Sequence, residues 1–155
     1  MDLAERQCRL AAGLTGRGAG PEGMDPGALE RARRGLESKR RRAAAHLLPR
    51  LRAALGADWK DRFAEHAARY IPSGLLYHVD DAWEMAETLA RGPDLETARA
   101  ARDDLVSLRL RWARGREAGA ERIRERRGFL IALLRRPVRF LVVRTPGGRV
   151  WRFRV

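Results

Sequence analysis

The sequence predicts an α+β fold that is mainly α: a compact helical bundle followed by a small C-terminal antiparallel β-hairpin or three-stranded sheet. Two observations lead to this prediction. Apolar residues recur at helical spacing through residues 25–114, whereas the last segment, RVWRFRV, alternates apolar and basic residues as a half-buried strand does. With 155 residues, the chain has the length of one domain with a modest core.

Proline and glycine divide the N-terminal part. We expect residues 1–24 to form a short helix followed by a glycine-rich, flexible linker. Residues 25–55 begin with Asp-Pro, a capping carboxylate followed by a proline at the first helical position. They predict a long helix that Gly35 and Pro49 interrupt. This helix should bury a stripe of leucines, Leu47, Leu48, Leu51 and Leu55.

Three more helices complete the predicted bundle. Asp58 should cap the first, which carries aromatic residues at helical spacing. After a loop over residues 71–79, Asp80 or Asp81 should open the second helix. Short helices with short connections indicate compact packing. The third helix should span residues 95–114 and turn five residues inward, Ala98, Ala101, Leu105, Leu108 and Trp112.

The pattern changes after the bundle. Residues 115–128 are charged, with Ile123 as their one sizeable apolar residue, and we expect an exposed connector, either a loop or a solvated helical extension. Residues 129–155 should form the β-region, in which the turn residues TPGG join the two strands of a hairpin. Residues 129–135 either add a third strand or end as a short helix.

The alternation in the last strand also predicts where its side chains point. Trp151, Phe153 and Val155 alternate with Arg152 and Arg154, which places the apolar side chains on one face. This mixture of aromatic residues and arginines suits either stacking on nucleic-acid bases or packing on the bundle. Because the alternation already gives Trp151 a core-facing position, we favour packing.

The sequence shows no recognisable catalytic constellation. Its serines lie in no nucleophile-elbow context, and a phosphate-binding loop is missing. His46, His66 and His78 lack the i, i+4 spacing that would place two metal ligands on one helical face. The least poor candidate is His78 beside Asp80 and Asp81, although a loop histidine next to a helix cap explains it better. A single cysteine excludes an internal disulfide. We expect no catalytic residue, metal or cofactor in this chain, which is not expected to be an enzyme by itself.

The formal net charge of +13 indicates an anionic partner: nucleic acid, an acidic peptide or an acidic protein surface. However, Lys39 and Lys60 are the only lysines among the 33 cations, and GC-rich genomes produce this arginine bias without a polyanion. Nucleic-acid binding is therefore the alternative function. The longest apolar run, residues 129–134, is too short to cross a bilayer, and the N-terminus lacks a signal-peptide layout. We expect a cytoplasmic protein with no membrane partner.

Four segments in order carry a family resemblance: KRRRAAAHLLPRLRAALG, WKDRFAEHAARY, DAWEMAETLA and RRPVRFLVVRTPGGRVWRFRV. Over residues 27–155 the chain resembles the accessory subunits of multinuclear non-haem iron oxidative enzymes in ribosomal peptide natural-product biosynthesis. The helical part resembles the domain described as DNA-binding in the methanobactin partner protein. The resemblance implies that iron lies in the partner enzyme and that this chain carries none.

The resemblance also implies two binding surfaces. The helical body would contact the iron enzyme in a heterodimer, through Leu76, Tyr77, His78, Asp80 and Trp83. An edge strand of the β-region would pair with the extended leader of the precursor peptide. The residues expected at the peptide are Arg139, Phe140, Leu141, Val142, Val143, Arg144, Val150, Trp151, Arg152, Phe153 and Arg154.

Overall fold

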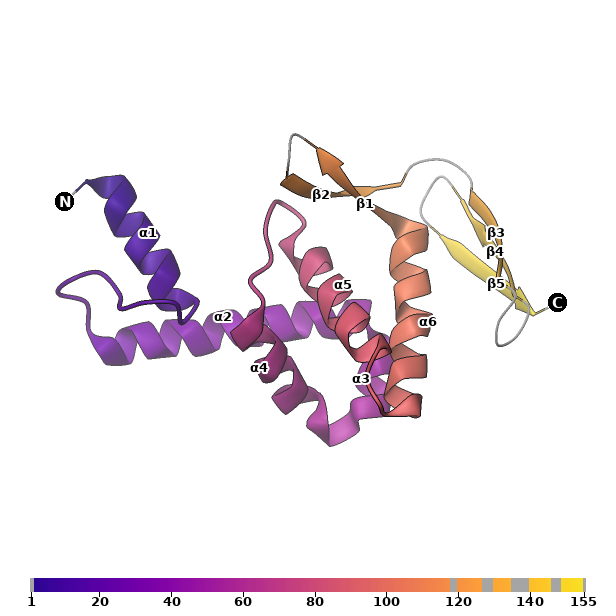
Figure 1. Cartoon of the computed structure of the whole chain (residues 1–155), viewed down its shortest axis with the longest axis horizontal. Coiled ribbons are helices and arrows are strands. Elements are labelled where there is room, and N and C mark those ends of the chain that lie inside the picture. Colours follow the sequence, from indigo (N-terminus) through magenta and orange to yellow (C-terminus); the bar gives the residue numbers. More distant parts are fainter. Residues whose placement is uncertain (1, 118–119, 127–129, 135–139, 146–148, 155) are drawn as a thin grey trace.

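The computed structural model of the chain describes residues 2–117, 120–126, 130–134, 140–145 and 149–154. The described part contains six α-helices, one short 3₁₀ turn and two small antiparallel sheets (Figure 1). The fold is therefore α+β and mainly α, as predicted. None of the described helices is both long and apolar enough to span a membrane.

The chain begins with two helices, α1 (Leu3–Leu14) and α2 (Pro26–Leu47). Both helix starts follow the sequence prediction. The carboxylate of Asp25 accepts hydrogen bonds from the backbone N–H groups of Gly27 and Ala28, at 3.0 and 2.9 Å. The Asp-Pro pair thus begins α2 as a helix N-cap does, because it satisfies two N–H groups that have no partner inside the helix.

Proline interrupts the long helix and glycine does not. α2 continues through Gly35, so the interruption predicted there is wrong, and the break comes before Pro49, where α3 (Pro49–Leu55) begins. A glycine inside a helix costs only about 1 kcal/mol, whereas a proline costs about 3 kcal/mol because it removes an N–H and clashes with the preceding turn. Gly56 ends α3 with a φ of +52°, in the region that favours glycine.

The N-terminus of α3 is capped from another helix. Asp104 on α6 (Leu95–Arg111) is buried and accepts hydrogen bonds from the backbone N–H groups of Arg50 and Leu51, at 3.0 and 2.9 Å. Burial raises the pKa of Asp104, although the hydrogen bonds from Leu51 and Arg50 act in the opposite direction. The contact fixes the position of α3 against α6.

The bundle is completed by η1 (Gly56–Asp58), α4 (Trp59–Arg69) and α5 (Tyr77–Ala90), and α5 packs along α6 (Figure 1). The predicted leucine stripe and the predicted inward residues are buried or partly buried, which confirms both, but α6 ends at Arg111 and not at residue 114, so Trp112 belongs to the strand that follows. Asp58 makes no capping side-chain hydrogen bond with a described residue, so its predicted role is wrong. The large core residues are Leu48, Leu51, Trp59, Phe63, Val79, Trp83, Met85, Leu105 and Leu108.

The predicted charged connector contains a β-hairpin. β1 (Trp112–Glu117) leaves α6 directly and pairs antiparallel with β2 (Ala120–Glu125), so that Arg114 lies opposite Ile123. Trp112 is buried, and Ile123 packs partly against the core. The expectation of a loop or solvated helix is wrong because charge does not mean exposure here: Arg114 is partly buried against carboxylates of α5.

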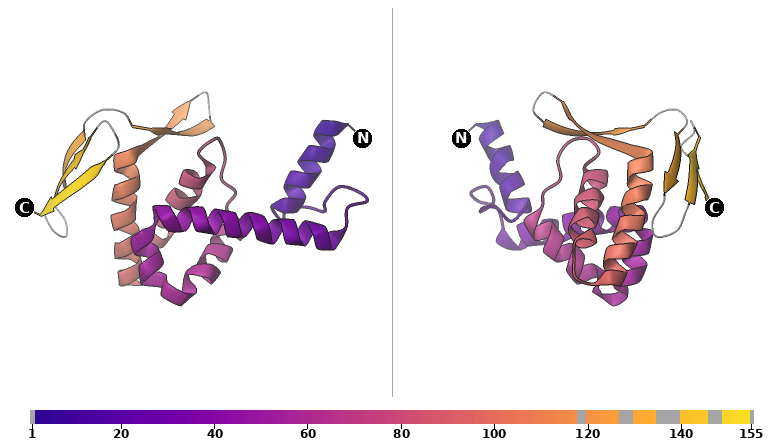
Figure 2. Two further views of the ribbon diagram at one scale, coloured as in Figure 1. Left: turned by 180° about the vertical axis from the view of Figure 1, so that it is seen from behind. Right: turned by 45° about the vertical axis from the view of Figure 1, so that its right-hand side comes forward.

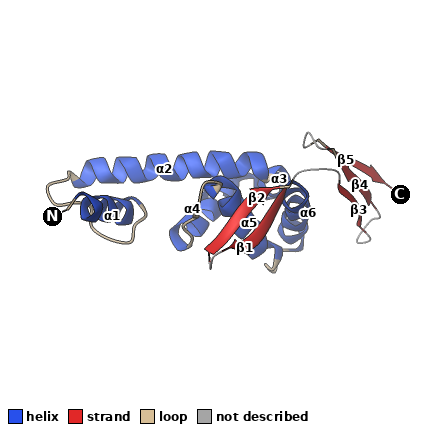
Figure 3. Cartoon of the chain, turned by 90° about the horizontal axis from the view of Figure 1, so that it is seen from above, coloured by secondary structure: helices blue, strands red, loops and turns tan. Residues whose placement is uncertain are grey.

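The C-terminal β-region is a second sheet in the order β3 (Leu130–Leu134), β4 (Phe140–Arg144), β5 (Val150–Arg154). The three-stranded alternative is thus confirmed. The predicted turn falls largely outside the described residues, but the N–H of Thr145 donates to the carbonyl of Arg149 at 2.9 Å. Figures 2 and 3 show this sheet beyond α6, at the opposite end of the molecule from α1.

Candidate functional site

Two adjacent carboxylates in α5 organise a buried polar network. Asp81 receives two hydrogen bonds from the guanidinium of Arg40 on α2, at 2.8 and 2.9 Å. The Nε2 of His66 on α4 donates to the same carboxylate at 2.8 Å. Burial alone would raise the pKa of Asp81, but the hydrogen bonds from Arg40 and His66 outweigh it and hold the pKa below its ordinary value. Asp81 is therefore an ionised group that ties three helices together.

Asp80 binds the other side of the network. The hydroxyl of Tyr70 donates to it at 2.6 Å, and the backbone N–H of Ser73 donates at 3.1 Å. Arg114 on β1 also donates to Asp80, at 3.3 Å, and reaches Glu84 at 3.2 Å. Burial and the hydrogen bond to Asp80 both raise the pKa of Tyr70 above its ordinary range. This half of the network joins the hairpin to α4 and α5.

The network holds the start of the loop between α4 and α5, and the first turn of α5 closes the loop at its other end. Tyr70 is bonded through its hydroxyl to Asp80 and through its carbonyl to Arg40. At the other end, the carbonyl of Leu76 accepts from the N–H of Val79 at 2.9 Å. In this part of the chain, Leu75 is 98% exposed and Tyr77 is 49% exposed. The end of the loop and the first residue of α5 therefore present two large side chains to solvent.

The predicted enzyme-contact residues are only partly at the surface. Asp80 and Trp83 are buried, so their assignment to a contact surface is wrong: Asp80 is bonded within the network and Trp83 packs in the core. Leu76 and His78 are half-buried, whereas Tyr77 is exposed. Neither aspartate begins α5, which starts at Tyr77, because both carboxylates bind other elements instead of capping their own helix.

Sequence reasoning missed four members of the network, Arg40, His66, Tyr70 and Arg114. For His66 and Tyr70 the sequence does contain a signal, namely their helical spacing from a core residue. His66 follows the core residue Phe63 by three positions and precedes Tyr70 by four, so all three lie on the inward face of α4. Nothing comparable distinguishes Arg40 within its run of arginines.

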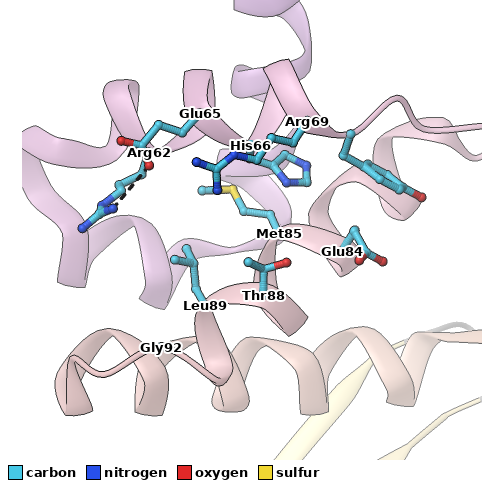
Figure 4. Close-up of a pocket in the computed structure, with 10 residues that line it drawn as sticks. Arg62, Glu65, His66, Arg69, Glu84, Met85, Thr88, Leu89 and Gly92 are labelled. Atoms are coloured by element: carbon cyan, nitrogen blue, oxygen red, sulfur yellow. Dashed lines mark hydrogen bonds and ion pairs between the residues drawn. The ribbon is translucent and has the colours of Figure 1, made fainter.

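A pocket of about 380 Å³ opens between α4 and α5, beside His66 and Tyr70 (Figure 4). It combines charged groups with the apolar side chains of Met85 and Leu89. No three His, Cys, Asp or Glu side chains of the described residues come together as a metal-binding group. The lining residues are Arg62, Glu65, His66, Arg69, Tyr70, Glu84, Met85, Thr88, Leu89 and Gly92.

His78, the candidate catalytic histidine, does not join the two aspartates. Its ring packs edge-on against Tyr77, with the ring centres 5.6 Å apart. Among the described residues, no hydrogen bond links His78 to Asp80 or Asp81, whose oxygens are bound by other side chains. The geometry therefore does not support the catalytic alternative. The prediction of a loop histidine beside a helix cap is also wrong, because His78 lies in the first turn of α5 and neither aspartate caps that helix.

The C-terminal sheet exposes its aromatic residues. Trp151 is 53% exposed and Phe153 is 51% exposed, so the favoured packing of Trp151 against the bundle is wrong. Val142 is fully buried and lies in register with Arg152, whereas Val143 is in register with Trp151. Because neighbouring residues of a strand point to opposite faces, Val142 lies on one face of the sheet, and Val143, Trp151 and Phe153 lie on the other.

The order of the strands decides which backbone can receive a peptide. β4 is the central strand and pairs with β3 and β5, so the predicted pairing of a peptide with β4 is wrong. β5 keeps an outer edge that no described strand occupies. Of the predicted peptide-binding residues, Phe140, Leu141, Val142, Val143 and Arg144 lie on β4, and Val150, Trp151, Arg152, Phe153 and Arg154 lie on β5. Arg139 falls outside the described residues.

The basic run of α2 is partly neutralised along its own helix. Arg34 pairs with Glu30 at 2.9 Å, and Arg41 approaches Glu37 to 3.7 Å. Both pairs have the i, i+4 spacing expected of a solvated helix face. Much of the positive charge on α2 is thus neutralised by glutamates of the same helix.

The family described as "SCO6045-like, C-terminal domain" matches residues 4–91 of this chain, from α1 to the end of α5. The match covers more than half of the 155 residues. It includes Arg40, His66, Tyr70 and both aspartates of the network, whereas Arg114 and the two sheets lie beyond it. Neither the curated proteins nor the solved structures give a significant match.

Proposed function

We propose that this chain, which belongs to the SCO6045-like, C-terminal domain family, is a non-catalytic accessory subunit that binds a partner protein and an extended peptide. Its helical body would contact the partner, and its C-terminal sheet would receive the peptide. The segment order described above favours a multinuclear iron oxidative enzyme as the partner. It favours the leader of a ribosomal precursor peptide as the ligand, with the iron in the enzyme and not in this chain.

The observation that carries this proposal is the exposed aromatic pair on an edge strand. Trp151 and Phe153 lie two residues apart on β5, so they share a face, and each is about half exposed. An extended peptide pairs with such an edge through its backbone, while side-chain contacts on the face provide selectivity. Exposed edges favour aggregation, and a strand that keeps both an edge and two aromatics exposed suits a ligand.

The α4–α5 loop supports the partner surface. The buried network binds the loop backbone at Tyr70 and Ser73, and Leu75, two residues further on, is almost completely exposed. An apolar side chain on a fixed backbone loses little conformational freedom when a partner covers it, which favours binding. Tyr77, an aromatic residue of the kind common at binding hot spots, lies close by in the sequence.

The test measures the two surfaces separately. The leader peptide of a precursor encoded next to this chain, labelled with a fluorophore, is titrated by anisotropy. The neighbouring oxidase is tested by co-purification with the full chain. Trp151→Ala combined with Phe153→Ala should weaken peptide binding about tenfold or more and spare co-purification. Tyr77→Ala is the matched aromatic control, for which we expect unchanged peptide affinity.

For the partner surface, Leu75→Asp should abolish co-purification and leave peptide affinity unchanged. Leu95→Asp is the matched control, because Leu95 is 80% exposed at the first position of α6, where an acidic residue is tolerated. Failure to bind both the oxidase and the peptide at micromolar concentrations would refute the proposal.

Nucleic-acid binding is a second candidate, favoured by the same exposed aromatics on a basic sheet. Bases stack on such side chains in proteins that bind single strands. Because phosphate contacts release counterions, binding to a labelled oligonucleotide should weaken steeply between about 50 and 200 mM salt. An absence of binding to single and double strands at low salt removes this candidate.

A further inference from the structure

The pocket between α4 and α5 has the size and composition of a small-molecule site. Its volume of about 380 Å³ lies within the range of about 300–1,000 Å³ typical of ligand pockets. Met85 is buried in the core and still lines the pocket, and Leu89 is half-buried beside it. Leu89 offers apolar contact area, Met85 closes the pocket on the core side, and the rings of His66 and Tyr70, with centres 5.5 Å apart, lie beside them.

The charges around this pocket do not balance. Glu65 is bound by Arg62 at 3.3 Å, and Glu84 is bound by Arg114 at 3.2 Å. The fourth charged residue of the lining is Arg69, for which no ion pair with a carboxylate is found in the described part of the chain. Figure 4 shows Arg69 among the side chains that gather over the pocket from α4. Both acidic residues thus have an arginine, and one guanidinium remains for a ligand.

From this arrangement we infer that the pocket binds a carboxylate with a short apolar body. Arg69 pairs with the carboxylate, for which the planar guanidinium offers two parallel N–H donors. Met85 and Leu89 contact the aliphatic or aromatic part. A bare inorganic anion would leave these apolar side chains unused, and an uncharged ligand would leave Arg69 unused.

Two sources supply this chemistry: a free carboxylic acid and the C-terminal residue of a peptide. The inference does not depend on the function proposed above. The pocket lies between two helices of the bundle, whereas the peptide surface lies on the sheet beyond α6 (Figure 1). The two sites can therefore be lost independently.

The experiment titrates the full chain with 4-phenylbutyrate and follows backbone amide signals by NMR. We expect saturable shifts concentrated in α4 and α5. The alcohol 4-phenylbutanol, which has the same body without the charge, should bind about tenfold or more weakly, because it loses a charge-assisted pair of hydrogen bonds.

Two variants and a control test the assignment. Arg69→Gln should weaken 4-phenylbutyrate about tenfold or more and leave 4-phenylbutanol unchanged. Thr88→Trp, at an exposed position in the lining, should fill the pocket and weaken both compounds. Arg99→Gln, an exposed arginine on α6 outside the pocket, should change neither. Circular dichroism verifies that each variant is folded.

A tetrapeptide ending in phenylalanine distinguishes the two sources. Tighter binding of the free acid form than of both its amide and 4-phenylbutyrate supports a peptide terminus, and the reverse order supports a small acid. Unsaturable binding of 4-phenylbutyrate and the tetrapeptide at millimolar concentration, or equal affinity of the native protein and Arg69→Gln, overturns the inference.

Discussion

The buried pair of Arg40 and Asp81 gives the strongest prediction for stability. Arg40→Met removes the guanidinium and keeps the aliphatic volume, which leaves the carboxylate of Asp81 buried with His66 as its remaining side-chain donor. Removing one partner of a buried ion pair costs about 3–5 kcal/mol. Because the Nε2–H of His66 still donates to the carboxylate of Asp81, we expect the lower end, about 3 kcal/mol. That is a large share of the total stability of about 5–15 kcal/mol that a domain has.

The same substitution should change the pH dependence of stability. The lowered pKa of Asp81 means that its contribution is present at neutral pH and is lost as the pH falls through that lowered pKa. Without Arg40, burial dominates and raises the pKa of Asp81. The ionised carboxylate then lowers the free energy of unfolding at neutral pH, whereas in the native protein it raises it. The difference between Arg40→Met and the native protein should therefore be widest near about pH 7 and narrow toward about pH 3.

Urea unfolding followed by far-UV circular dichroism measures both effects. Arg34→Met is the matched control on the same helix, because Arg34 pairs with Glu30 at the surface and should contribute about 0.5 kcal/mol or less. A loss of under about 1 kcal/mol for Arg40→Met at neutral pH would refute the reasoning, given what a buried pair should cost. So would a difference that stays constant with pH.

Three further predictions follow from single contacts. Asp104→Asn should change the free energy of unfolding by less than about 1 kcal/mol at neutral pH in urea. The raised pKa of Asp104 means that its contribution is present at low pH and is lost as pH rises, and an amide oxygen still accepts both backbone N–H groups. Tyr70→Phe should cost about 1–3 kcal/mol in the same assay. It should also remove a tyrosine transition that lies above the ordinary range in an ultraviolet pH titration, because the pKa of Tyr70 is raised. Gly20→Ala should lower the melting temperature only slightly, because its Cβ would lie 2.8 Å from the terminal Cδ2 of Leu29, which can move aside. Gly35→Ala, with open space around it, should raise stability by up to about 1 kcal/mol.

The parts of the fold that sequence predicts well depend on neighbouring residues. Asp25 caps α2 because its carboxylate reaches N–H groups two and three residues ahead. The leucine stripe before Gly56 is buried because helical spacing places those side chains on one face. Turn residues and alternation likewise predict β4 and β5.

The network was unpredictable because its partners are distant in sequence. Arg40 and Asp81 are 41 residues apart, and Arg114 reaches Asp80 across 34 residues. Composition treats each of these residues as a surface charge, since most charged side chains are exposed. Their burial follows from the packing of α2, α4, α5 and β1, which no local pattern specifies.

The orientation of the C-terminal sheet shows a different limit. Alternation in β5 establishes that Trp151 and Phe153 share a face, but it does not determine which face is covered. In the structure Trp151 and Phe153 are exposed, and the buried Val142 lies on the other face, in register with Arg152. An alternating strand can bury either of its two faces, and only the packing of the folded protein decides which face is buried.

The structure changes the meaning of the high arginine content. Arg40 and Arg114 are structural cations inside the protein, each bound to carboxylates of α5. Arg34 and Arg62 pair with glutamates on their own helices. These arginines would have to release existing partners before they bound phosphates, so the net charge of +13 overstates the charge available to nucleic acid. Among the described residues, the exposed side chains of Leu75, Trp151 and Phe153 are in no ion pair that a partner would have to break, which favours the proposed protein or peptide partner over a polyanion.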